Sequence, residues 1–191
     1  TAGRAATGTM QTSSPDPVPP TLLSYAGDGW LLLDGGVAVA RGGADDIVEL
    51  PAGARTALAV PGAEVAIHWL DLAEGLTQAQ AAAAARLMLA DASAEALGDL
   101  HVAVGRAERG LTPVALVPNG MMAEWAAGDP DMIVPSPLLL LPPEESLVRY
   151  DGMAVPDYRG VAAAFSVEPE LAALMIGEAP VRAVDETEFE A

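Results

Sequence analysis

His68 and His101 are the only two histidines in the chain, and imidazole is the side chain best suited to proton transfer and metal binding near neutral pH. Both lie in short apolar runs typical of strands, "EVAIHWLDL" and "DLHVAVG". Neither belongs to an HxH or HxxxH pair of the kind that binds metals. We therefore expect each imidazole to be hydrogen-bonded at a sheet edge, and we predict neither a metal ligand nor a catalytic histidine.

The step Asp34-Gly35-Gly36 is a second candidate, because it follows an apolar run. In actin-like nucleotide-binding folds, an acidic-glycine loop after the first strand receives phosphate on its backbone amides while the Asp organises a metal. Here another apolar run follows at once, and no Ser, Thr or Lys is present to hold phosphate or magnesium. Since glycine adopts a positive φ at no steric cost, the step favours a hairpin turn.

The remaining reactive side chains form no catalytic motif. The chain has no phosphate-loop, dinucleotide-binding or nucleophile-elbow sequence. Three serines have no partner nearby in sequence, although the fold could bring one to them: Ser24, Ser136 and Ser166. Neighbouring acids indicate solvated loops and turns: Asp45-Asp46, Glu144-Glu145, and Asp129 with Asp131 around Pro130. We therefore predict no catalytic residue, no cofactor and no enzymatic activity.

Composition narrows the class of partner. The 191 residues carry a formal net charge of −18, and all nine basic residues are Arg. Such a chain is repelled by phosphate backbones and anionic membranes, which excludes nucleic acid as a partner and favours a basic protein surface. There is no Cys, and the chain shows neither an 18-residue apolar run nor a signal peptide.

In the first half of the chain, turn residues separate short apolar runs. Residues 1–20 lack periodicity and predict a flexible leader. A hairpin or meander is expected over residues 21–50, followed by the strands "RTALAVP" and "EVAIHWLDL" with Pro61-Gly62 as the turn between them. A helix begins at Thr77, where Gln80 completes a capping box, and places Ala81, Ala85, Met88 and Leu89 on one face. Ser93 is expected to cap a further turn that Gly98 ends.

The second half alternates strands with two short helices. "HVAVG" and "TPVALVP" predict paired strands, Asn119 is expected to cap the helix "GMMAEWAA", and "MIVP", "SLVRY" and "MAVPDYRGVAAAFS" supply further strands. "EPELAALMI" predicts a helix. The side chains Met121, Met122 and Trp125, and likewise Leu171, Leu174 and Met175, fit either a core face or a partner-binding face. Residues 178–191 are rich in acids and predict a mobile tail or linker. The element order indicates an α/β (α+β) fold with more strand than helix.

Several stretches, read in order, resemble the cytoplasmic domain of type II secretion system protein L (GspL). The resemblance covers residues 28–177, and its most specific parts are "VPGAEVAIHWLDL" before the long helix, "DLHVAVG", and "VPSPLLLLP" before the strand that contains Arg149. Each motif alone is weak evidence, and the resemblance depends on their order and spacing together. The sequence thus divides into a leader (1–20), a GspL-like domain (21–177) and an acidic tail (178–191).

The resemblance implies an actin-like, RNase H-related architecture of β-rich lobes that has lost its nucleotide chemistry. It also implies a non-catalytic scaffold on the cytoplasmic side of the inner membrane, which binds the N-terminal region of the secretion ATPase (GspE-type). In a longer protein, GspM-type and other platform proteins are implied partners, and a homodimer is possible. Two alternatives stay open: an actin-like nucleotide-binding protein or ATP-binding pilus-assembly scaffold, with Asp34 as its phosphate-loop acid, and an unrelated acidic α/β domain.

Overall fold

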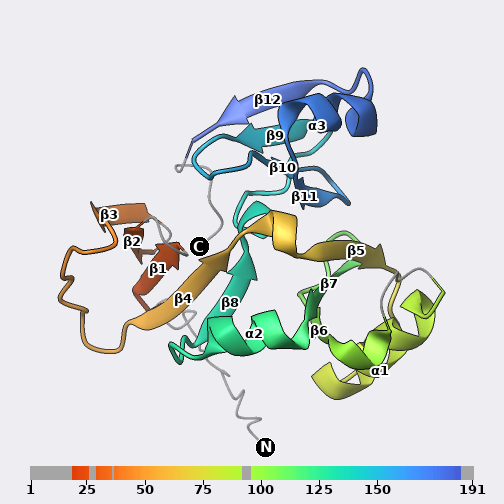
Figure 1. The fold of residues 1–191 in the computed structure, drawn as a ribbon, viewed down its shortest axis with the longest axis horizontal. Helices are drawn as coiled ribbons and strands as arrows, with labels where there is room; N and C mark the ends of the chain where they lie inside the picture. Colours follow the sequence, from red (N-terminus) through yellow and green to blue (C-terminus); the bar gives the residue numbers. More distant parts are fainter. Residues whose placement is uncertain (1–18, 26–28, 36, 92–95, 186–191) are drawn as a thin grey trace, which may run out of the picture.

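Three β-sheets and three α-helices make up the fold in this computed structural model, which describes residues 19–25, 29–35, 37–91 and 96–185 (Figure 1). The sheets contain five, three and four strands and meet near the short 3-10 turns Gly62–Glu64 (η1) and Ser136–Leu138 (η3). Strand predominates over helix, so the predicted α+β class is confirmed. Ser93, Gly36, residues 1–18 of the predicted leader and residues 186–191 of the predicted tail lie outside the described residues.

The five-stranded sheet has the order β3-β2-β1-β4-β8. Its strands are β1 (Thr21–Tyr25), β2 (Gly29–Asp34), β3 (Val37–Gly42), β4 (Arg55–Val60) and β8 (Met132–Pro135). The first three form the predicted antiparallel meander, while β4 and β8 run parallel to β1 and to each other. Gly35 has a φ of 53° at the turn after Asp34, as a hairpin there requires.

Side-chain hydrogen bonds hold β4 to the start of β8. Asp131 Oδ2 accepts from the Thr56 amide at 2.8 Å and from its hydroxyl at 3.1 Å, and the Asp131 amide donates to Thr56 Oγ1 at 3.1 Å. The amide and hydroxyl of Thr56 lower the pKa of the exposed Asp131 carboxyl. Asp131 therefore joins two parallel strands, whereas the sequence indicated only turn chemistry; Asp129, with a φ of 51°, does lie in a turn.

A three-stranded unit is inserted between β4 and β8. Its sheet has the order β5-β7-β6, with β5 (Ala66–Leu70), β6 (Leu100–Val104) and β7 (Thr112–Pro118) antiparallel to one another. Helix α1 (Gln78–Leu89) packs on it through Ala81, Ala85 and Leu89, and the Thr77–Gln80 capping box is confirmed. Met88 is 52% exposed, so its placement on the buried face was wrong. The adjacent β4 and β5 belong to different sheets, and η1 connects them in place of a simple turn.

Two other local expectations for this unit were wrong. Asn119 is the first residue of helix α2 (Asn119–Ala126), and its side chain donates to the Gly98 carbonyl at 3.1 Å instead of capping the helix. Gly98 does not end a helical segment, because it lies inside the 3-10 turn η2 (Leu97–Asp99). One contact links the two residues, since the Asn119 side-chain amide satisfies a carbonyl of the turn that precedes β6.

The four-stranded sheet has the order β11-β10-β9-β12 and is formed by the C-terminal part of the described chain. Its strands are β9 (Leu147–Tyr150), β10 (Asp157–Arg159), β11 (Ala164–Ser166) and β12 (Val181–Val184), and helix α3 (Pro169–Ile176) precedes β12. Strand β12 pairs in parallel with β9, so residues 181–184 are not the mobile tail that their composition predicted. Backbone pairing with β9 orders this short segment despite its acidic neighbours.

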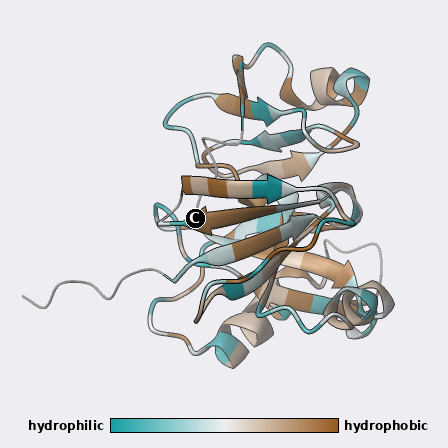
Figure 2. Ribbon diagram, turned by 90° about the vertical axis from the view of Figure 1, so that its left-hand side faces the viewer, coloured by the Kyte–Doolittle hydropathy of each residue, from teal (hydrophilic) through white to brown (hydrophobic). Residues whose placement is uncertain are grey.

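Apolar residues gather on the strands of all three sheets (Figure 2). One buried cluster joins the five-stranded sheet to residues 139–140 and β9, and includes Leu23, Leu140 and Val148. A second lies between α1 and its sheet, and includes Ala85, Val102 and Val114. The first cluster thus joins the five-stranded and four-stranded sheets, and it shares no residue with the second, which lies within the inserted unit.

Candidate functional site: a buried polar junction of three sheets

The two histidines do not form a site. His68 pairs with Val114 and His101 with Val117 on the central strand β7. Because side chains alternate along a strand, residues 114 and 117 face opposite sides of the sheet, and so do the histidines. Both side chains are half-buried on the outer strands. Within the described residues, no group of three or more His, Asp or Glu side chains could hold a metal ion.

The other acidic candidates are at the surface. Asp34 is exposed at the turn between β2 and β3. Asp46 lies in an exposed loop, where it accepts from the Gly43 amide at 2.7 Å, and the Glu144-Glu145 pair is exposed before β9. These positions match the solvated loops and turns that the sequence predicted.

Two of the three candidate serines come together on a carboxylate that the sequence did not single out. Ser136 Oγ donates to Asp157 Oδ1 at 2.9 Å, and Ser166 Oγ donates to the same oxygen. Ser136 Oγ also accepts from the Gly62 amide at 3.2 Å. The third serine, Ser24, donates to the Ala57 carbonyl at 3.3 Å within its sheet. The cluster therefore joins η1, η3, β10 and β11.

Burial raises the pKa of Asp157 to about 6, although the hydroxyls of Ser166 and Ser136 act in the opposite direction. The side chain is only 1% exposed. Its second oxygen, Oδ2, has no hydrogen-bond partner among the described residues. A carboxyl in this environment resists ionisation, because hydroxyl donors replace only part of the lost hydration.

The close packing of this cluster requires glycine at position 62. A Cβ atom there would overlap both Ser166 Oγ and the Pro137 ring. The φ of Gly62 is not in the left-handed region, so the requirement comes from space and not from backbone conformation. Gly62 thus lets the backbone of η1 approach η3 and β11.

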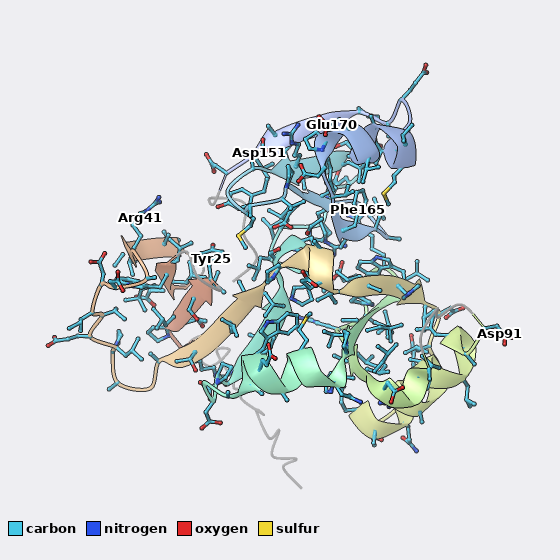
Figure 3. The ribbon with its side chains drawn as sticks, viewed as in Figure 1. Tyr25, Arg41, Asp91, Asp151, Phe165 and Glu170 are labelled. Atoms are coloured by element: carbon cyan, nitrogen blue, oxygen red, sulfur yellow. The ribbon has the colours of Figure 1, made fainter. Side chains whose placement is uncertain are left out.

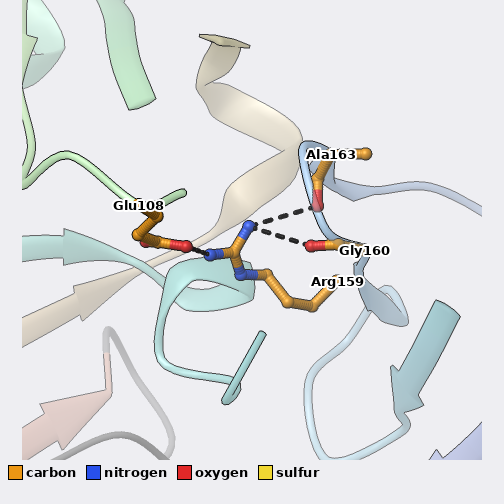
Figure 4. Close-up of polar contacts among 4 residues, drawn as sticks. All are labelled: Glu108, Arg159, Gly160 and Ala163. Carbon is orange, nitrogen blue, oxygen red and sulfur yellow. Dashed lines mark hydrogen bonds and ion pairs between the residues drawn. The ribbon is translucent and has the colours of Figure 1, made fainter. Parts of the chain in front are cut away.

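Arg159, two residues after Asp157 on β10, binds the inserted unit to the C-terminal sheet (Figure 4). Its side chain is 1% exposed and forms an ion pair with Glu108, which is 25% exposed. Nη1 also donates to the carbonyls of Gly160 at 3.2 Å and Ala163 at 3.4 Å. The guanidinium carbon lies 4.6 Å from the centre of the Trp69 ring on β5, a cation–π geometry.

A tight turn presents Glu108 to this arginine. Glu108 and Leu111 exchange backbone hydrogen bonds of 2.7 and 2.9 Å, and the two residues between them, Arg109 and Gly110, have φ values of 50° and 86°. Positive φ at both central positions is typical of a type I′ turn, which favours glycine at the second. The connection between β6 and β7 therefore has a defined shape that places a carboxylate over β10.

We call the set of Gly62, Trp69, Glu108, Ser136, Asp157, Arg159 and Ser166 the three-sheet junction. Its hydrogen bonds and ion pair form a polar network that joins η1, η3, β10, β11 and the β6–β7 turn. The sequence analysis missed Glu108, Asp157 and Arg159. One signal was present: in "DYR" two opposite charges alternate with an aromatic residue on a strand, which places both charges on one face.

Exposed apolar side chains mark the outside of the molecule. Leu171, Leu174 and Met175 on α3 are 53%, 81% and 63% exposed, so they do not pack internally. Met121, Met122 and Trp125 on α2 are half-buried. Charged side chains such as Asp91 and Asp151 also lie at the outer edges (Figure 3). No helix of the described chain is long and apolar enough to cross a membrane.

Comparison with known proteins yields solved structures only. No protein-family model matches the chain, and no curated protein sequence matches it. The cytoplasmic domain of EpsL, an inner membrane component of the type II secretion system of Vibrio cholerae, superposes with a TM-score of 0.59 at 14% identity, over 86% of this chain and 80% of that one. The chain shares the fold of the EpsL cytoplasmic domain. The resemblance predicted from the sequence is thus confirmed for the fold.

Arg159→Met should lower the free energy of unfolding by about 3 kcal/mol, because it removes one partner of a buried ion pair and leaves Glu108 uncompensated. Arg149→Met is the matched control. Arg149 pairs with the exposed Asp151, so its loss should cost about 1 kcal/mol or less. Urea unfolding of both variants measures the difference. Adding Glu108→Gln to Arg159→Met should restore part of the loss, and equal effects of the two arginine variants would contradict the assignment.

Asp157→Asn should change how stability depends on pH. The pKa of Asp157 is about 6 in the folded state and lower when unfolded, so its contribution to stability is fully present below about pH 4 and is lost as pH rises through about 6. The asparagine variant lacks this loss. Its unfolding free energy, relative to the unsubstituted protein, should rise by at most about 3 kcal/mol between pH 4 and pH 7. Parallel pH profiles from denaturant titrations would show that Asp157 ionises freely in the folded protein.

Proposed function

We propose that this chain is a non-catalytic component of the inner-membrane platform of a type II secretion system, and that it recruits the cytoplasmic secretion ATPase (GspE-type). The observation that carries the proposal is the likeness of its fold to the EpsL cytoplasmic domain over 86% of the chain. In this proposal the described residues lie on the cytoplasmic side of the inner membrane. GspM-type and other platform proteins, and a second copy of the chain, are further partners.

The charge of the chain supports a protein partner with a basic surface. A net charge of −18 produces a long-range attraction for positive patches and accelerates their encounter. The same field disfavours nucleic acid. Binding to the ATPase region should therefore weaken as ionic strength rises.

The purified domain and the N-terminal region of the cognate ATPase should elute together in size-exclusion chromatography, and titration calorimetry should give saturable heat. The physical basis is the combination of exposed apolar side chains with an acidic surface. In typical interfaces apolar side chains form the core and polar ones form the rim. No binding at high micromolar concentrations of both proteins would overturn the ATPase proposal.

Two exposed leucines provide a matched pair of variants for this binding experiment. Leu174 on α3 is 81% exposed and has Leu171 and Met175 beside it, whereas Leu87 on α1 is 80% exposed. We expect Leu174→Glu to weaken binding and Leu87→Glu to leave it unchanged, because larger apolar patches mark interaction sites. If Leu87→Glu weakens binding and Leu174→Glu does not, the ATPase contacts the α1 side of the molecule instead.

The nucleotide-binding alternative has a separate test. Calorimetry with ATP and magnesium should give no saturable heat, because Asp34 lies at an exposed hairpin turn without Ser, Thr or Lys beside it. Saturable binding that Asp34→Ala abolishes would favour a nucleotide-binding protein and contradict the loss of nucleotide chemistry.

A further inference from the structure

A cavity of about 100 Å³ adjoins the three-sheet junction. Its buried lining includes Ser136 and Asp157 of the junction. Ala63 and Ala154, both exposed, lie on its outer side, and the half-buried Met153 and Val155 provide apolar walls. The cavity therefore runs from small surface residues to a buried carboxyl group, with a mostly apolar wall between them.

Only one oxygen of that carboxyl group has free bonding capacity. Oδ1 accepts both serine hydroxyls, whereas Oδ2 has no hydrogen-bond partner among the described residues. Asp157 is 1% exposed, so bulk water does not satisfy Oδ2. A buried acceptor left without a donor is costly, and a ligand that supplies the donor relieves this cost.

The geometry selects a class of donor. Guanidinium groups bind carboxylates best through two parallel hydrogen bonds, one to each oxygen, and here Oδ1 already accepts two hydroxyls. An ammonium group is a compact charge that can bind a single oxygen. The apolar wall made by Met153 and Val155 suits the methylene stem of an alkylammonium chain.

We propose that this cavity binds a primary alkylammonium group, the side chain of a lysine on a protein partner, with the ammonium on Asp157 Oδ2 and the methylene stem against Met153 and Val155. The occupant comes from another molecule, because this chain contains no Lys. The net charge of −18 attracts such a group. The proposal does not depend on which protein supplies the lysine, and so it stands apart from the secretion ATPase.

Met153 is shared by two cavities. It lines both this cavity and a neighbouring one of about 160 Å³ beside Tyr25 and Trp30. Asp157 Oδ2 itself is buried. Methionine has three rotatable bonds and adapts to new shapes, so a change of its rotamer can open the path without moving the backbone.

The test uses the whole chain at about pH 7.5, above the pKa of Asp157, where the carboxyl is ionised. Titration with n-butylammonium chloride, followed by amide NMR, should shift the signals of Ser136, Asp157 and Ser166 in a saturable way. Titration with 1-butanol, which has the same stem without the charge, should not. A short peptide with one lysine should give the same shifts as butylammonium. If butylammonium binds and the peptide does not, the occupant is a small-molecule amine and the assignment to a protein lysine is overturned.

Two variants and a control locate the site. Asp157→Asn should weaken butylammonium binding by about tenfold or more, as expected for loss of a hydrogen bond to a charged group. Ala154→Phe should block the outer side of the cavity without touching the junction, and it keeps the proposal testable if Asp157→Asn fails to fold. Asp151→Asn removes a nearby exposed carboxylate and should leave binding unchanged. Equal binding by all variants, or equal shifts with 1-butanol, would overturn the proposal.

Discussion

The buried guanidinium of Arg159 is the interaction on which the placement of the inserted unit against the C-terminal sheet depends. A charge that is 1% exposed must be compensated, and Glu108, two backbone carbonyls and the face of Trp69 provide that compensation. These groups come from the β6–β7 turn, the C-terminal sheet and β5. Each can make its contact only if the two sheets approach in one orientation. The ion pair thus selects a single arrangement of parts whose apolar contacts alone are less specific.

The composition explains why such a polar constraint is needed. Aromatic residues make up only 4% of the chain, and much of the core consists of alanine and short aliphatic side chains. Small side chains interlock little, so apolar packing alone discriminates weakly between the native arrangement and similar alternatives. Because the two buried apolar clusters share no residue, the hydrogen bonds of Asp157 and the ion pair of Arg159 supply the directional contacts between them.

Local sequence patterns predicted most helices and strands, but they did not predict contacts between residues far apart in the sequence. The Thr77–Gln80 capping box and the turn after Asp34 depend on residues within three positions, and both are present. The contacts Ser136–Asp157 and Glu108–Arg159 join residues 21 and 51 positions apart, so no spacing rule reveals them. Strand β12 was missed because its order comes from pairing with β9, while its acidic neighbours indicated a tail. The GspL resemblance predicted the architecture, since ordered motifs carry long-range information that periodicity lacks.

The insertion of a whole unit between β4 and β8 also limits the order in which the chain can fold. Thr56 and Asp131 are 75 positions apart, yet they bond directly across these parallel strands. Closing so long a loop is entropically costly and slow, whereas the β6–β7 hairpin needs only a two-residue turn. The hairpin can therefore form early and shorten the effective distance between β4 and β8. On this route β8 joins the five-stranded sheet after the inserted unit has formed, and the edge of β4 stays open to misassociation until β8 covers it.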